Sequence, residues 1–323
     1  MGLTSHSLSR ILIQTNRKYF MKKLLSVLLL ASVLTAQARE VVTIIYSWTA
    51  SDTAANFHRS LADEANKIQD KYTFIFDTKP GAGGSVAANY ILSNSQNNSI
   101  LANSSAFFIR PNFFPVSESH DIGQFKELLP VCSAPIVIAS KKYKSWNEVP
   151  HDKSLSIGIS GLGTTTHLVV TQLAKKYPNL VVIPFKSTSE AVLSVLNGTT
   201  DFSVNFLGDI EQYKEGKNQI YALGITGNQT VAGVKTLASE GFSKDLELMN
   251  SPAQLLVPAN MSDSKFKEWR EILLKAGRSQ VVLDSFKPDH CQDIDQAPDA
   301  EIQTWYHKQT NDWRRLTQGV SLQ

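Results

Sequence analysis

Two glycine-rich turns contain the groups in this sequence that are best suited to hold a small anion. Pro80 to Ser85 (PGAGGS) comes straight after a predicted strand and straight before a predicted helix, and Ser160 to His167 (SGLGTTTH) repeats this order later in the chain. Glycines let a backbone approach a ligand closely, and the start of a helix offers unpaired N–H groups with a partial positive charge. The two turns are predicted to face one cleft.

Other interpretations of these turns stay open. A tight strand-to-helix connection without a ligand has the same composition. Thr164 to Thr166 could also cap the helix without binding a ligand. His167 is interpreted as a packed histidine rather than a catalyst. The first turn fits neither a phosphate-binding loop nor a dinucleotide loop, because it lacks the Lys-Ser/Thr pair and the G-x-G-x-x-G spacing.

Two further polar segments are expected at the same edge. Asn103-Ser104-Ser105 follow a predicted strand, and open α/β sheets bind ligands beyond their strand ends. Trp48, Thr49 and Ser51 lie between the first predicted strand and the first helix. Trp48 either stacks on a ligand or covers the hinge, and the residues alone do not decide between these roles.

The sequence offers little for catalysis. It has no G-x-S-x-G or H-E-x-x-H motif, and its seven histidines are scattered. Cys132 and Cys291 lie outside any metal-binding spacing, and whether they form a disulfide is left open. Binding is therefore favoured over an enzyme, and we predict no catalytic residue, no metal and no cofactor.

The first 38 residues are predicted to be an export signal. Lys22 and Lys23 precede an apolar run that is too short to span a bilayer, and Ala36-Gln37-Ala38 suits a signal peptidase. The true start is then either Met1 or Met21, with cleavage near Ala38 and a periplasmic destination. Removing these residues leaves 285 of 323 residues and 27 of the 32 Lys+Arg, against 29 Asp+Glu. The mature chain is then slightly acidic, so no nucleic-acid partner is expected.

Short β-branched runs alternate with helix-period stretches, a pattern typical of largely parallel sheets covered by helices. The predicted strands are 41–46, 72–77, 100–102, 155–159, 181–184, 201–205 and 220–225, and the predicted helices are 53–68, 86–92, 165–176, 189–196, 209–215, 262–276, 279–286 and 299–316. A mature chain of this length predicts two domains. Because the last three helices lack strands of their own, lobe 1 is predicted as 39–135 plus 251–323 and lobe 2 as 136–250, with crossings at 131–139 and 247–257.

The order and spacing of several motifs resemble the receptor components of tripartite tricarboxylate transporters, also called Bug-type solute-binding proteins. The likeness covers nearly the whole mature chain and is carried by PGAGGS (80–85), RPN (110–112), GLGTTTHL (161–168), VIPFK (182–186), LNGTTD (196–201) and YALGIT (221–226). It implies an α/β fold of two lobes, a type II-like Venus flytrap with two crossover strands and a helical C-terminal segment on lobe 1. It also implies a monomer that captures a small carboxylate, largely through backbone N–H groups, for a membrane permease of the tripartite tricarboxylate type.

One departure from the family pattern concerns charge. Where the family usually has a Gly-Gly step, this chain has Ser51-Asp52. Asp52 is interpreted first as a helix cap; if it points inward instead, it repels a polyacid and favours a ligand with an amine or a neutral end. Two rival functions are a binding protein for a membrane sensor and, less favoured, a periplasmic hydrolase. The predicted ligand-binding residues are Trp48, Ser51, Ala82, Gly83, Gly84, Ser85, Asn103, Ser104, Ser105, Gly161, Gly163, Thr164, Thr165, Thr166, Lys186, Asp201 and Asn205.

Overall fold

The structure is a computed structural model that describes residues 38–94, 98–293 and 299–321. Its contacts separate residues 1–40 from residues 41–323, and the architecture below is that of the second unit. The predicted export signal and the choice between Met1 and Met21 lie outside the described residues.

A six-stranded sheet forms the core of lobe 1, in the order β11-β4-β10-β3-β1-β2. Its strands are β1 (Glu40–Tyr46), β2 (Tyr72–Thr78), β3 (Ser99–Ser104), β4 (Phe125–Ala134), β10 (Ser251–Pro258) and β11 (Gln292–Asp293). β1 and β3 run parallel, whereas β10 runs antiparallel to both β3 and β4. The sheet is therefore mixed, and the prediction of a largely parallel sheet was wrong for the strands that return from the other lobe.

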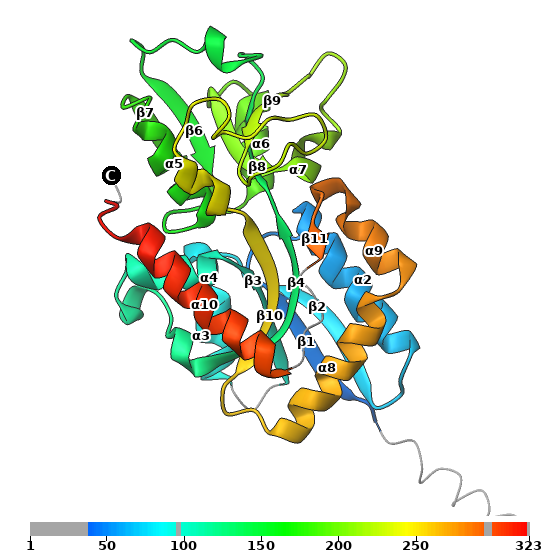
Figure 1. The fold of residues 1–323 in the computed structure, drawn as a ribbon. Helices are drawn as coiled ribbons and strands as arrows, with labels where there is room; N and C mark the ends of the chain where they lie inside the picture. The colour runs from blue at the N-terminus through cyan, green and yellow to red at the C-terminus, as the bar shows by residue number, and fades with distance from the viewer. Residues whose placement is uncertain (1–37, 95–97, 294–298, 322–323) are drawn as a thin grey trace, which may run out of the picture. The chain divides into compact units, whose positions relative to one another are not determined.

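Helices cover both faces of this sheet, as Figure 1 shows. They are α2 (Thr53–Lys67), α3 (Ser85–Ser93), α4 (Ala106–Ile109), α8 (Asp263–Gly277), α9 (Gln280–Phe286) and α10 (Asp299–Thr317). Alternate residues of a strand point to opposite faces, so Ile44 packs in the cluster that contains Leu61 of α2 and Trp269 of α8. Ile45 packs instead with Phe107 of α4 and Trp313 of α10. The helices after β10 thus complete lobe 1.

Lobe 2 is built on a five-stranded sheet in the order β7-β6-β8-β5-β9. Its strands are β5 (Ile136–Ser140), β6 (Leu155–Ile159), β7 (Leu180–Pro184), β8 (Phe202–Phe206) and β9 (Tyr221–Ile225), and its helices are α5 (Thr165–Ala174), α6 (Thr188–Leu196) and α7 (Leu207–Glu211). α7 ends at Glu211, whereas the sequence predicted a helix to Glu215, because the chain turns there toward Gly216 at φ +90°.

The chain passes between the sheets twice, as the long strands β4 and β10 show in the centre of Figure 1. β4 ends at Ala134 and β5 begins at Ile136, and the return reaches β10 at Ser251. The two crossing strands pair with each other from Ser251 opposite Ala134 to Pro258 opposite Phe125. A disulfide joins Cys132 of β4 to Cys291, which directly precedes β11.

Candidate functional site

A cavity of about 70 Å³ lies between the two lobes and is lined by residues of both. One water needs roughly 10–15 Å³ by this measure, so the cavity has room for about five water-sized groups. Six of the predicted ligand-binding residues line it: Trp48, Asn103, Ser104, Thr164, Thr165 and Thr166. The structure therefore brings together polar residues that follow strands of two different sheets.

Hydroxyl groups from both lobes meet at one end of this cavity. The hydroxyl of Ser105 contacts that of Thr165 across the lobes and lies 3.1 Å from that of Ser251. Thr164 is the N-cap of α5, and its side chain accepts a hydrogen bond from His167 N. The cap leaves the backbone N–H groups of Thr165 and Thr166 without an acceptor among the described residues, as is usual for a first helical turn.

Asn103 adds a third donor at this end, which we call the donor end (Asn103, Thr165, Thr166 and Ser251). It is 2% exposed, and its Oδ1 accepts a hydrogen bond from Ser104 N at 2.7 Å. Its Nδ2 is buried without a partner. A buried amide without a partner is unfavourable, so this N–H pair is suited to a ligand oxygen.

The first glycine turn packs behind the donor end and does not line the cavity. Gly84 has φ +92°, and a Cβ added there would lie 2.5 Å from Nδ2 of Asn103, so only glycine fits beneath this amide. At Gly83 an added Cβ would contact Arg110 and Thr164. Arg110 donates from Nη1 to the carbonyl of Leu162 at 2.9 Å and so joins the two turns.

Direct contact of this turn with a ligand is therefore not supported in this arrangement. Ala82 to Gly84 form a short 3₁₀ turn in which Gly83 and Gly84 are buried and Ala82 is exposed, and the Ser85 hydroxyl lies 2.9 Å from Nδ1 of buried His120. Gly163 packs against Phe114, where an added Cβ would lie 2.9 Å from the ring. Gly161, half-buried at φ +108°, shapes the same turn.

Four other predicted residues lie outside the cavity lining. Ser51 and Lys186 are exposed, with the backbone N–H of Lys186 donating to Glu190, and Ser105 is buried behind Thr165. Asn205 is buried in β8, and in the amide orientation that satisfies both side-chain atoms it donates to Thr188 O at 3.1 Å. Asn205 thus supports a lining residue without facing the cavity.

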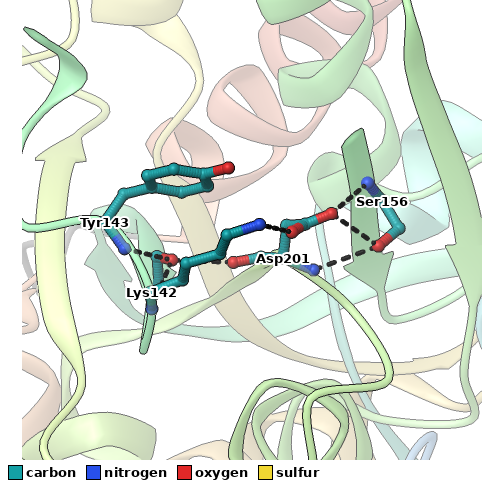
Figure 2. A network of polar contacts seen from close by, with 5 residues as sticks. Lys142, Tyr143, Ser156 and Asp201 are labelled. Carbon is teal, nitrogen blue, oxygen red and sulfur yellow. Dashed lines mark hydrogen bonds and ion pairs between the residues drawn. The ribbon is translucent and has the colours of Figure 1, made fainter. Parts of the chain in front are cut away.

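The structure places Asp201, another predicted ligand-binding residue, outside the lining of the interlobe cavity. Asp201 precedes β8, so it lies at the amino end of that strand, whereas the cavity lies at the carboxyl end beside Phe206. Figure 2 shows its carboxylate turned toward Ser156 and Lys142. The backbone N–H of Ser156 donates to it at 2.9 Å and Lys142 at 3.1 Å. These hydrogen bonds outweigh burial, which alone would raise the pKa of Asp201, and the pKa lies below its usual value.

Asp52 points into the cavity and is not a helix cap. It occupies the N-cap position of α2, but its side chain accepts no capping hydrogen bond. Its Oδ1 instead accepts from Ser189 of lobe 2 at 2.8 Å, and its Oδ2 from Tyr46 at 3.4 Å. The interpretation as a cap was wrong, because the chain before α2 turns the carboxylate toward the lobe interface. Burial and the negative charge of Asp209 raise the pKa of Asp52 to about 6.

Sequence reasoning missed two residues beside Asp52, namely Asp289 and His58; the three together form what we call the acidic end. Asp289, in the short turn Lys287–Asp289 after α9, accepts a hydrogen bond from Gly208 N of lobe 2 at 3.0 Å. Burial and the charge of Asp209 raise its pKa to about 8. His58 of α2 is 1% exposed, and burial lowers its pKa to about 3, so it is neutral. No local pattern marks either residue, because α9 and α2 meet only in the folded chain.

Within the described residues, no group of three or more His, Cys, Asp or Glu has an arrangement that would hold a metal ion. A search of the same residues also finds no helix with the length and apolar character needed to cross a bilayer.

The arrangement of two α/β lobes around a cavity, joined by two crossing strands, defines the class of two-lobed solute-binding proteins. The structure of the periplasmic binding protein BugD is similar, with a TM-score of 0.77 and 19% identity over 86% of this chain and 96% of that one. An R. palustris protein solved with adipate has a TM-score of 0.74 and 15% identity over 87% and 97%. MatC from Rhodopseudomonas palustris, solved with bound malate, has a TM-score of 0.70 and 13% identity over 87% and 100%.

Residues 57–316 match the family described as tripartite tricarboxylate transporter family receptor, so the chain belongs to this family. The match confirms the family and the fold expected from the motifs, and it makes the protein a solute-binding receptor rather than an enzyme. The comparison with curated proteins gave no match.

Proposed function

We propose that this protein is a periplasmic receptor that captures a small carboxylate between its lobes and delivers it to a membrane permease of the tripartite tricarboxylate type. The observation that carries the proposal is the donor end of the interlobe cavity. There the buried amide of Asn103 and the first-turn N–H groups of Thr165 and Thr166 lack acceptors within the described chain. The malate and adipate in the two R. palustris structures support a carboxylate as the ligand class.

Both lobes contribute to this end, so binding is coupled to closure. Asn103 and Ser251 belong to lobe 1, whereas Thr165 and Thr166 begin a helix of lobe 2. A carboxylate held by Asn103 gains the N–H groups of α5 only when the lobes meet. We propose that residues 39–135 plus 251–323 and residues 136–250 move as two bodies. The closed, liganded form is the one that the permease distinguishes from the empty form.

A few hydrogen bonds suffice for the expected affinity. Each hydrogen bond to a charged group contributes roughly 1.5–3 kcal/mol, and micromolar binding corresponds to about 8 kcal/mol. Three or four donors reach this value after the entropy of ordering is subtracted. No metal or cofactor is required, and we propose a monomeric receptor.

Calorimetry with mono-, di- and tricarboxylates on wild type and Asn103→Asp tests the proposal. The substitution keeps the size of the side chain but replaces the unpaired N–H group by a carboxylate oxygen, so carboxylate affinity should fall at least tenfold. Thr165→Val removes the hydroxyl that joins the lobes and should weaken binding about three- to tenfold. Thr171→Val is the matched control, because Thr171 lies in the same helix and donates to Leu168 O. Equal affinities in all four proteins would exclude this site.

A further inference from the structure

We propose that the acidic end of the cavity binds an ammonium group, so that the ligand is a small zwitterion with one carboxylate and one protonated amine. The inference rests on the proposed function, because it assumes that the same cavity holds the ligand. It assigns the carboxylate to the donor end and the ammonium to Asp52, Asp289 and His58, all of which line the cavity.

Buried carboxylates gather at the acidic end. The carboxylates of Asp52 and Asp289 from lobe 1 lie near that of Asp209 from lobe 2. The negative charge of Asp209 raises the pKa of both. Across residues 38–94, 98–293 and 299–321, none of the three takes part in an ion pair. Buried like charges are stable only if protons or a cation neutralise them.

The hydrogen-bond partners show which carboxylates are available to a ligand. Asp209 accepts from Thr53 at Oδ1 and from Phe206 N at Oδ2, and unlike Asp52 and Asp289 it does not line the cavity. Asp289 accepts only from Gly208 N, at Oδ1, within the described part of the chain. Its second oxygen therefore retains its full acceptor capacity at the cavity wall.

His58 supplies the second, independent observation. Its Nδ1 is buried and has no hydrogen-bond partner, although the residue lines the cavity. The ring lies 5.1 Å from that of Tyr46 and 4.8 Å from that of Phe57. A neutral imidazole with the proton on Nε2 offers Nδ1 as an acceptor, which matches an ammonium N–H. Asp52, Asp289 and His58 each line the cavity with a group that can accept a hydrogen bond from an ammonium.

The walls beside these acceptors are aromatic. Tyr46, Trp48, Phe57 and Phe286 line the cavity, and the rings of Phe57 and Phe286 are 4.5 Å apart. Aromatic faces attract organic cations and exclude water, whereas a metal ion requires a tighter set of ligands. No described group of acidic residues or histidines has the arrangement for a metal. The chemistry therefore suits an amine better than an inorganic cation.

Matched ligand pairs test this inference on the wild-type protein. The pairs are glycine and acetate, β-alanine and propionate, 4-aminobutanoate and butanoate, and aspartate and succinate, measured by calorimetry at pH 8.5. A thermal-shift screen of the twenty protein amino acids accompanies them. In at least one pair the amine should raise affinity tenfold or more. This comparison needs no mutant, so misfolding cannot obscure it.

Asp289→Asn and Asp52→Asn should then reverse the preference. Each should weaken the amine compound at least tenfold and strengthen its deaminated partner, because a negative charge near the bound carboxylate is gone. Asp201→Asn is the matched control, since that carboxylate faces Ser156 and Lys142 instead of the cavity. If carboxylates bind but no amine compound binds more tightly than its partner, the zwitterion inference is overturned and the proposed function stands. If no carboxylate or amino acid binds at all, both are overturned.

Discussion

The hydroxyl of Ser189, in lobe 2, donates to Oδ1 of Asp52, in lobe 1, over 2.8 Å. The same hydroxyl lies 3.2 Å from the carbonyl of Ser51. Ser189 thus joins the start of α6 to the segment before α2, next to Asp52 in the cavity lining. Thr53 and Gly208 add two more contacts between the lobes on this side. The side chain that the family pattern would not predict, Asp52, is therefore part of the closed lobe interface.

Ser189→Ala should shift the receptor toward its open form. The substitution removes a hydrogen bond to a carboxylate, worth about 1.5–3 kcal/mol at most, and apparent affinity falls with the fraction of closed protein. We expect ligand affinity to fall about three- to tenfold, with the melting temperature nearly unchanged. Calorimetry measures the affinity, and small-angle scattering of the empty protein should show a larger radius of gyration. Ser154→Ala, at an exposed position of lobe 2, is the control. A variant with wild-type affinity and scattering would show that Ser189 does not bias closure.

The elements that carry the donor end could be predicted because their signals are local. A buried strand, such as the one that contains Ile157, is followed directly in the sequence by a polar turn and then by a helix-period stretch. The same logic located Thr164 to Thr166 and Asn103, which the structure brings to one cavity. It could not foresee that Gly83 and Gly84 lie beneath Asn103 and Thr164, because this depends on how the two turns pack.

The acidic end could not be predicted, since its residues come from segments that meet only in the folded chain. His58 lies inside the helical period of α2, where it resembles an ordinary buried residue. Asp289 follows α9 in a short turn that has no distinguishing pattern. The sequence did single out Asp52, but the preference of aspartate for helix N-caps favoured the interpretation as a cap over the inward orientation. The disulfide between Cys132 and Cys291 likewise could not be predicted from the sequence, because the spacing of two cysteines along the chain does not give the distance between them in the fold.

The stability of the empty protein should fall as pH rises from about 6.5 to about 8. Asp289 keeps its proton in the folded state up to about pH 8, whereas an unfolded aspartate loses it near pH 4. A raised folded-state pKa therefore contributes stability at low pH that is lost as pH rises through it. The loss should be on the order of 1 kcal/mol per pH unit. Asp52 acts in the same direction at lower pH, near its pKa of about 6.

Other groups around the acidic end set the window for this measurement. Buried neutral histidines act in the opposite direction, because burial lowers the pKa of His58 to about 3 and those of His120 and His167 to about 4. Their contribution is complete above the unfolded histidine value near 6.5. Tyr46 does not titrate here, since burial and Asp52 raise its pKa well above its ordinary value. Glu127 and Asp209, whose pKa values burial also raises, act in the same direction as Asp289, so the contribution of Asp289 is the difference between wild type and Asp289→Asn in urea unfolding at pH 6.5 and 8.5. Asp289→Asn should reduce the decline; an unchanged decline in that variant would assign it to another group.

The disulfide should stabilise the fold and also fix the acidic end. Cys132 and Cys291 are separated by 159 residues, so the bridge closes a long loop, and removing a bridge of this kind costs about 2–5 kcal/mol. Asp289 lies two positions before Cys291, and both cysteines line the cavity. We therefore expect Cys132→Ala/Cys291→Ser to lower the urea midpoint and to weaken the bound ligand severalfold. Reductant should lower the midpoint of wild type only, because the double variant has no bridge to lose. Identical midpoints for wild type with and without reductant, when thiol titration confirms reduction, would show that the bridge contributes nothing to stability.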